Sequence, residues 1–162
     1  MSEIKYPYLP PGRIIEHVPA DNFYIRFARE YARLHSLDKT MPNASVVVLG
    51  GRIIAAGANG SLYHEQSGCE RVRLGCQSGQ GYDLCEGCHP KNHGEATALR
   101  HAAERGVDVC GADLYMWGHY WCCQPCWDAM IAAGLRRVIL LDRSWVLFDR
   151  ASPGNIVGHQ LD

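Results

Sequence analysis

Two short motifs bring together side chains of the types that bind zinc. His93-Gly94-Glu95 supplies an imidazole and a carboxylate, and Cys123-Gln124-Pro125-Cys126 supplies two thiols. One histidine and two cysteines make three metal ligands, a number that keeps a fourth position for water and marks catalytic rather than structural zinc. Glu95 is then spare, and a spare carboxylate beside zinc can act as general base and acid. The motifs therefore predict a catalytic Zn²⁺ bound by His93, Cys123 and Cys126, with Glu95 as the catalytic residue.

Each motif opens a segment with helical character. The apolar residues between Glu95 and Arg105 recur at helical spacing and stop at Gly106, and a second helix is expected from Cys123 to Ala133, ended by Gly134. Helix N-termini carry free backbone N–H groups and the positive end of the helix dipole, which lowers the pKa of nearby thiols. The metal ligands are thus expected where two helix starts converge.

The remaining segments predict an α/β fold. Asp21 to His35 has mainly helical spacing, with Asp21 as the expected N-cap. Ala44–Leu49 and Ile53–Ala56 read as a hairpin around Gly50-Gly51-Arg52. Strands over Ala112–Trp117 and Arg137–Leu141, separated by a helix, predict a parallel pair with a right-handed crossover. A last strand is expected at Trp145–Phe148.

Length and composition limit the class of protein. The 162 residues, 47% of them hydrophobic, suit a single domain spanning 1–162. A net charge of -1 gives no general attraction to phosphate backbones, so a nucleic-acid partner is not expected. The sequence shows neither an apolar signal core nor an apolar run approaching the roughly 18 residues of a membrane span. We expect a soluble cytoplasmic protein in which the eight cysteines serve metal binding rather than a disulfide framework.

The two motifs resemble the His-x-Glu and Pro-Cys-x-x-Cys signature of the zinc-dependent cytidine and deoxycytidylate deaminase superfamily. The similarity extends to Gly57-Ala58-Asn59-Gly60, which resembles the family's Gly-Tyr-Asn-Gly turn, and to Ala133–Val138, the step from helix to strand. It implies a three-layer α-β-α fold with a mixed sheet and hydrolytic removal of an exocyclic amine. It also implies contact between Asn59 and the substrate's sugar, and assembly into a homo-oligomer.

The chain departs from the family pattern at two positions. Cys122 stands where the family has proline, and Gly94 stands where alanine is usual. Because Cys122 and Cys126 are also nearly in register on a helix, an alternative ligand pair is open, although Cys123 with Cys126 is the pair we expect. Gly94 removes a methyl group and so widens the expected pocket.

A cysteine-rich insertion at about 60–92 separates Asn59 from His93. Parts of it, including Cys69, Arg71, Ser78-Gly79 and Leu84-Cys85, look like an insertion of microbial deoxycytidylate deaminases. Such a long irregular stretch is expected to be functional or tied down. We predict a second, structural zinc with Cys69, Cys85 and Cys88 as preferred ligands, while Cys76, His64 and His89 are also available.

The insertion also carries Arg71 and Arg73, candidates to hold a substrate phosphate. We interpret His101 and His119 as ordinary helix and loop residues. The four tryptophans are expected in the core or the pocket wall.

The favoured function is deamination of deoxycytidylate to deoxyuridylate. Alternatives within the enzyme class are deamination of cytidine, guanine, tRNA adenosine, the pyrimidine of riboflavin synthesis or a nucleoside antibiotic. An alternative of another class is a non-enzymatic zinc-binding module, which Glu95 argues against because it is placed beside the metal without being needed as a ligand.

Overall fold

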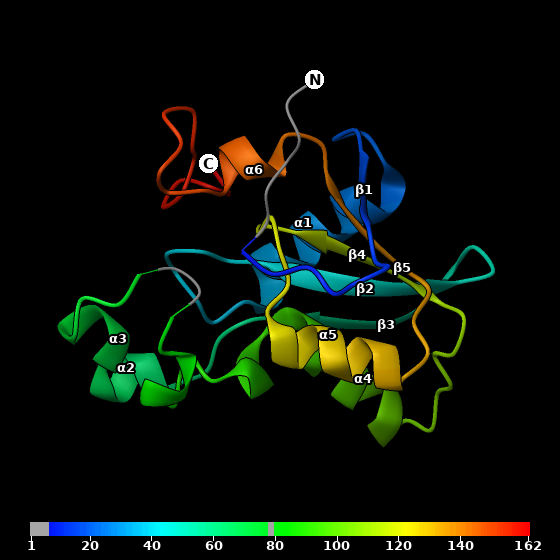
Figure 1. The fold of residues 1–162 in the computed structure, drawn as a ribbon, viewed down its shortest axis with the longest axis horizontal. Coiled ribbons are helices and arrows are strands. Elements are labelled where there is room, and N and C mark those ends of the chain that lie inside the picture. The colour runs from blue at the N-terminus through cyan, green and yellow to red at the C-terminus, as the bar shows by residue number, and fades with distance from the viewer. Residues whose placement is uncertain (1–6, 78–79) are drawn as a thin grey trace.

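A five-stranded mixed sheet forms the centre of the computed structural model, which describes residues 7–77 and 80–162 (Figure 1). The strands are β1 (Ile15–Val18), β2 (Ala44–Leu49), β3 (Arg52–Ala58), β4 (Asp113–Trp117) and β5 (Arg137–Leu141). Their order across the sheet is β1-β5-β4-β2-β3. β5 is parallel to β1 and β4, whereas β2 is antiparallel to β3 and β4. The predicted hairpin and the predicted parallel pair are both confirmed.

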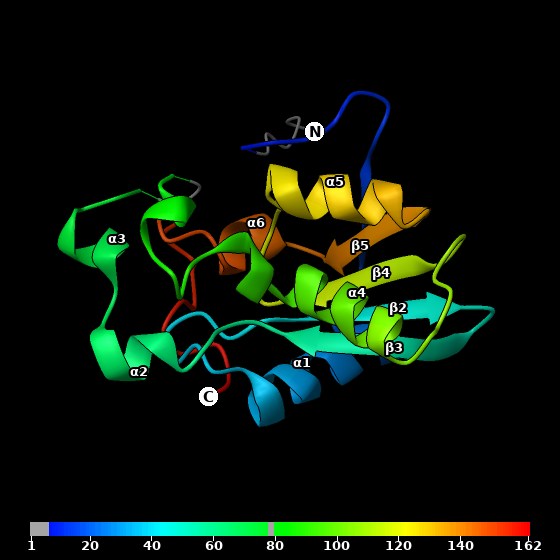
Figure 2. The ribbon, with the colours of Figure 1, turned by 90° about the horizontal axis from the view of Figure 1, so that it is seen from below.

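Helices cover both faces of this sheet and give the expected three layers. α1 (Phe23–His35) lies on one face, and α4 (Gly94–Glu104) and α5 (Gln124–Ala132) lie on the other (Figure 2). Alternate side chains of β2 serve the two layers, because successive residues of a strand point to opposite faces. Val46 and Val48 pack in the cluster around α1, and Val47 packs in the cluster around α4 and α5. The sheet is thus a buried platform on which α4 and α5 are fixed.

Three details differ from the sequence-based expectations. The N-cap of α1 is Asn22 rather than Asp21, since the Asn22 side chain accepts hydrogen bonds from the backbone N–H groups of Tyr24 and Ile25. The strand expected at Trp145–Phe148 is wrong: Ser144–Leu147 forms the short helix α6. A four-residue apolar run fits either structure, and the turn at Arg143, with φ of 63°, starts a helical turn that buries Phe148 against Trp117. The third difference is β1, which the sequence analysis does not predict.

The insertion is built from short pieces. It contains α2 (Tyr63–Ser67), α3 (Glu70–Arg73) and the 3₁₀ helices η1 (Tyr82–Leu84) and η2 (Pro90–Asn92). Ser78 and Gly79, which belong to its predicted motif, lie outside the described residues. Among the residues described between 61 and 92, only Cys85 and Gly87 are buried. This region therefore lacks an apolar core of its own.

None of the helices in the described part of the chain is long and apolar enough to cross a membrane.

Candidate active site

The two predicted motifs lie at the N-termini of α4 and α5. His93 is the N-cap residue of α4 and Cys123 that of α5, while Glu95 and Cys126 fall in the first helical turns. α4 sits close to the sheet because Gly57 of β3 has no side chain: a Cβ there would stand 2.2 Å from the backbone nitrogen of Ala98. Close packing on the sheet thus fixes the position of the α4 N-terminus relative to that of α5.

The three expected ligands converge at this point. The Nδ1 atom of His93 is 3.3 Å from the Cys123 sulfur and 3.5 Å from the Cys126 sulfur, and the three ligand atoms all lie within 4.8 Å of one another. Zinc bonds of about 2.3 Å to sulfur and about 2.0–2.1 Å to nitrogen give a tetrahedral N···S edge of about 3.5 Å. The donor types and the spacing of these residues therefore fit a zinc ion.

The orientation of the His93 ring is set by the insertion. Nε2 of His93 lies 3.2 Å from the backbone carbonyl oxygen of Cys88, so Nε2 carries the ring proton and donates a hydrogen bond to that oxygen. Nδ1 is then unprotonated and directed at the two sulfurs. Such a hydrogen bond to the distal nitrogen is the usual way in which a metal-binding imidazole is oriented.

Glu95 is a buried carboxyl group beside this cluster. The residue is 4% exposed, and burial raises its pKa above the ordinary value. The nearby His93 partly opposes that rise. A carboxyl group with a raised pKa can both accept and return a proton near neutral pH, which is what general acid and base catalysis requires.

The three thiols near the cluster differ in their ionisation and in their position relative to His93. The hydrogen bond from the Cys126 thiol, aided by His93, lowers the pKa of Cys123 below its ordinary value. Cys122 is fully buried, and its burial raises its pKa well above the ordinary value, so it stays a neutral thiol. It is also absent from the group of converging ligand atoms among the described residues. The geometry thus favours Cys123 over Cys122.

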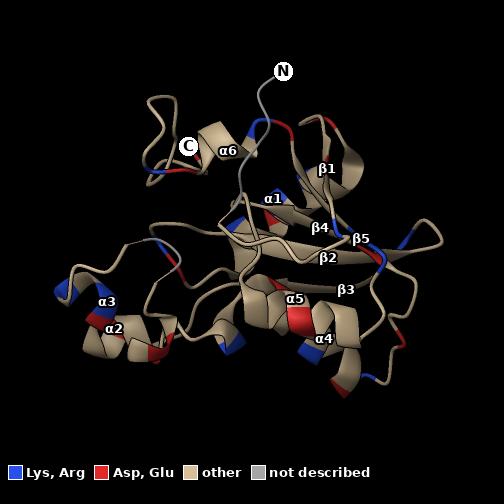
Figure 3. Cartoon of the chain, in the orientation of Figure 1, with Lys and Arg blue, Asp and Glu red and all other residues tan. Residues whose placement is uncertain are grey.

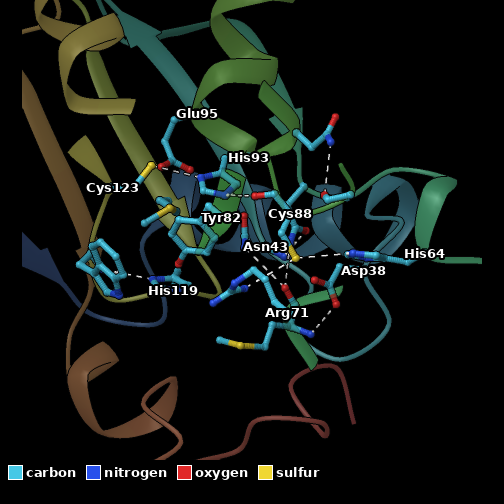
Figure 4. A pocket seen from close by; sticks show the side chains of 17 residues that line it. Asp38, Asn43, His64, Arg71, Tyr82, Cys88, His93, Glu95, His119 and Cys123 are labelled. Carbon is cyan, nitrogen blue, oxygen red and sulfur yellow. Dashed lines mark hydrogen bonds between the residues drawn. The ribbon is translucent and has the colours of Figure 1, made fainter. Parts of the chain in front are cut away.

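A pocket opens in front of the cluster and is walled by the sheet, by loops and by the insertion (Figure 4). Its lining includes Asn43, Asn59, Arg71, Tyr82, His93, Glu95, His119, Trp121 and Cys123. Two of the predicted metal ligands, the carboxyl group and two of the predicted substrate contacts, Asn59 and Arg71, therefore border one cavity.

Sequence comparison identifies the family. The sequence profile described as the cytidine and deoxycytidylate deaminase zinc-binding region matches residues 19–142. The chain belongs to the cytidine and deoxycytidylate deaminase family. As a deaminase of this family it is a zinc-binding hydrolytic enzyme, and the non-enzymatic alternative is set aside. A comparison with curated protein sequences finds no significant match.

Several solved structures of deaminases are similar to this chain. The dCMP deaminase from the cyanophage S-TIM5, in complex with dCMP and dUMP, is 21% identical with a TM-score of 0.51, over 75% of this chain and 82% of that one. A diaminohydroxyphosphoribosylaminopyrimidine deaminase/reductase from Thermotoga maritima is 24% identical with a TM-score of 0.44, over 72% of this chain but only 28% of the longer protein. A guanine deaminase from Bacillus subtilis is 21% identical with a TM-score of 0.45, over 78% and 66%. The cyanophage enzyme thus supports the expected deaminase fold.

Asn59 of this deaminase lies in the pocket wall, and its side chain forms hydrogen bonds with other residues of the protein. Its amide oxygen accepts hydrogen bonds from the Asn43 backbone N–H at 2.9 Å and from the Ser36 hydroxyl, while its amide nitrogen donates to the Met41 carbonyl at 2.9 Å. The residue therefore holds the loop before β2 against the end of β3. Its second amide N–H has no hydrogen-bond acceptor among the described residues.

Of the two predicted phosphate-binding arginines, only Arg71 borders the pocket. Its guanidinium group lies 4.3 Å above the ring of Tyr82 and donates to the carbonyls of Gln77 and Gln80. Arg73 instead pairs with Glu70 and bonds to Ser67, and it is not among the lining residues.

His119 lies at the pocket, although the sequence indicates an ordinary loop residue. The residue borders the pocket, and its Nδ1 accepts the backbone N–H groups of Tyr120 and Trp121, so the ring proton sits on Nε2. Burial is the main cause that lowers the pKa of His119 to about 4, which keeps the ring neutral. His119 precedes the second motif by only four residues, and that proximity is the one signal in the sequence that points to it.

Proposed function

We propose that this deaminase converts deoxycytidylate to deoxyuridylate and ammonia. The observation that carries the proposal is the buried Glu95 carboxyl group beside His93, Cys123 and Cys126 at the base of the pocket. We assign His93, Cys123 and Cys126 as the ligands of the zinc ion. When bound there, zinc supplies a polarised water as the nucleophile.

Glu95 is the residue that moves protons in the proposed reaction. As the attacking water adds to C4 of the cytosine, the carboxylate takes a proton from it and delivers a proton to the adjacent ring nitrogen, N3. The same carboxylate then takes the remaining proton from the hydroxyl group on C4 and passes it to the amine, which leaves as ammonia with the electrons of the C4–N bond while the C4 carbonyl forms. The net change is addition of one water and loss of one ammonia, so Glu95 ends in its starting state. Its burial excludes bulk water from this exchange.

Arg71 supports a nucleotide over a nucleoside. Three of its five N–H groups bond to Gln80, Gln77 and Cys88. Two therefore stay available to a ligand, counting partners among the described residues. A guanidinium group fixed by carbonyls and a tyrosine ring is preorganised for a phosphate group. Arg71 and Glu95 also line the same cavity, so one ligand can reach both.

The charge distribution does not favour a nucleic acid. Lys and Arg residues are interspersed with Asp and Glu along the elements in Figure 3. With a net charge of -1, the chain lacks the surplus of cations that a large phosphate backbone needs. A small nucleotide substrate fits better. Homo-oligomeric assembly and a cytoplasmic location stay predictions.

A substrate panel tests the proposal. Ammonia release is measured with deoxycytidylate, deoxycytidine, cytidylate, cytidine, guanine and an adenosine-containing RNA stem-loop. We expect the highest kcat/KM for deoxycytidylate. A higher value for any non-phosphorylated compound would remove the nucleotide assignment.

Arg71→Lys separates phosphate binding from general damage. The variant should lower kcat/KM for deoxycytidylate about 10–100-fold, because lysine cannot reproduce the paired N–H groups, and lower it far less for deoxycytidine. Arg73→Lys on the same short helix is the matched control and should leave both values unchanged. Equal losses on both substrates in Arg71→Lys would contradict a phosphate contact.

A further inference from the structure

The insertion brings four more metal-binding side chains together. His64 of α2, Cys69 before α3, and Cys85 and Cys88 after η1 each offer one ligand atom, and these atoms lie within 4.8 Å of one another. His64 Nε2 is 3.3 Å from the Cys85 sulfur and 3.5 Å from the Cys88 sulfur. The sulfurs of Cys69 and Cys88 are 3.6 Å apart. Cys76 and His89, the other available residues, are not in this group.

These separations match a tetrahedral metal site and are too long for a disulfide bond. Zinc with three sulfur ligands and one nitrogen ligand has edges of about 3.5 Å between nitrogen and sulfur and about 3.8 Å between sulfurs. A disulfide needs sulfurs at about 2.05 Å, and all four cysteines of the insertion are free thiols. The backbone also makes room for the imidazole, because a Cβ at Gly87 would stand 2.4 Å from His64 Nε2.

We propose that His64, Cys69, Cys85 and Cys88 bind a second zinc ion, and that Cys88 couples this site to the catalytic imidazole. The four ligands fill a tetrahedral coordination shell, so the site is structural. The sequence already favours the three cysteines. The structure adds His64 as the fourth ligand and adds the coupling.

The insertion needs such a site because it cannot stabilise itself by burial. Its larger apolar side chains are exposed, with Val72 at 78%, Leu74 at 66% and Leu62 at 54%. Binding a metal through residues from three separate pieces converts metal-binding free energy into local folding free energy. The zinc would therefore replace the missing apolar core.

Arg71 supplies the charge that this ligand set requires. Zinc with three thiolates and a neutral imidazole has a formal charge of -1. The Arg71 guanidinium group contacts the Cys88 sulfur at 3.6 Å and so compensates that charge. The same side chain packs on Tyr82, whose ring meets the His93 ring edge to face at 5.0 Å. One arginine thus joins the second site to the pocket wall.

Cys88 makes the direct connection to the active site. Its sulfur belongs to the second site, while its carbonyl oxygen accepts a hydrogen bond from the Nε2–H group of His93. Cys88 is therefore a positioning residue: fixing its sulfur fixes the carbonyl that orients the catalytic imidazole. This step rests on the proposed role of His93 as a zinc ligand, whereas the existence of the second site does not.

Metal analysis of the full-length protein tests the second site. We expect two zinc ions per chain in the wild type, one in Cys69→Ser and one in His93→Ala. Cys76→Ser, a change in the same insertion but outside the ligand group, should keep two. Cobalt-loaded His93→Ala should still show thiolate-to-cobalt absorption, a readout that needs neither activity nor the catalytic metal. One zinc in the wild type, or absence of that absorption from His93→Ala, would overturn the proposal.

The coupling has its own readout, the rate at which a chelator removes the catalytic zinc. In Cys69→Ser that rate should rise at least about tenfold, since the loss of a group supporting a metal ligand typically weakens binding 10–100-fold. Cys69→His, which again offers four ligands, should restore both the second zinc and the slow release. An unchanged release rate in a Cys69→Ser protein that holds one zinc would refute the coupling and leave the deaminase assignment intact.

Discussion

The two cysteine and histidine clusters use the same ligand types on different supports. His93, Cys123 and Cys126 stand on the first turns of α4 and α5, whose buried residues Ala98 and Trp127 anchor them to the sheet. His64, Cys69, Cys85 and Cys88 stand on loops and short helices that bury almost nothing. The first cluster is positioned by the fold, whereas the second is proposed to position its own surroundings.

The clusters also differ in whether the protein ligands would leave one coordination position of the metal open. Three ligands beside a buried carboxyl group suit chemistry at the metal, and four ligands suit a closed structural site. Glu70, an acidic residue beside Cys85 of the second cluster, is engaged by Tyr63 and Arg73. Glu95, by contrast, borders the pocket. Ligand number and the surroundings of the nearby carboxylate therefore distinguish the two roles, although cysteine spacing is similar in both.

The largest expected effect separates the ligand thiols from their neighbour. Cys126→Ser should remove the catalytic zinc and with it essentially all deaminase activity, because a hydroxyl is a poor substitute for a thiolate ligand. Cys122→Ser should keep the metal and most of the activity, since the Cys122 side chain is not among the converging ligand atoms of the described residues. Zinc content and ammonia release are measured on both proteins. The reverse result would make Cys122 the ligand.

The next effect isolates the carboxyl group from the metal. Glu95→Gln should retain zinc but lower kcat about 10²–10⁴-fold, the usual contribution of a positioned general acid and base. Glu104→Gln, an exposed change at the other end of α4, is the matched control and should behave like the wild type. Full turnover by a zinc-loaded Glu95→Gln protein would remove the proposed mechanism.

Removal of zinc by a chelator tests the difference between the two proposed metal sites without any substitution. A chelator can attack an open three-ligand site directly, but it must displace a protein ligand from a closed one. Zinc should therefore leave in two phases whose rates differ at least about tenfold, and activity should follow the faster phase. A chromogenic zinc indicator and an ammonia assay record both. If activity were lost only with the slower phase, the assignment of open and closed sites would be reversed.

The convergence of the proposed catalytic side chains is predictable from the sequence because each of these residues lies within a few residues of a helix start with a clear pattern. The regular apolar spacing after Glu95 marks the first helix, and Pro125 within the second motif marks the start of the other. The sheet is predictable for a related reason, since β2 and β5 are apolar runs bounded by turn residues.

The pocket wall cannot be predicted in this way. Tyr82, His64 and Asn43 reach it from segments without periodicity, so only the folded chain shows that they meet. The error at Trp145–Phe148 has a similar origin, because four apolar residues do not distinguish a strand from a helical turn. β1 carries a glutamate and a histidine in four half-buried residues, which hides its strand pattern.

The smallest expected effect concerns Gly94, where the family usually has alanine. A Cβ at this position would stand 3.1 Å from the Asn43 side-chain oxygen and 3.2 Å from the Gly57 carbonyl oxygen. Asn43 is 8% exposed and lines the pocket, so Gly94 accommodates a polar side chain in the pocket wall. Gly94→Ala should displace that side chain and raise KM by about 2–5-fold with kcat nearly unchanged, a loss of up to about 1 kcal/mol in substrate binding. Crowding should also oppose any gain in helix propensity from replacing glycine by alanine at this first position of α4. In the Asn43→Ala background the contact with the Asn43 side chain is gone and the contact with the Gly57 carbonyl oxygen stays, so Gly94→Ala should destabilise the protein against urea less than it does in the wild type. Identical effects of Gly94→Ala in both backgrounds would show that the two residues are not coupled.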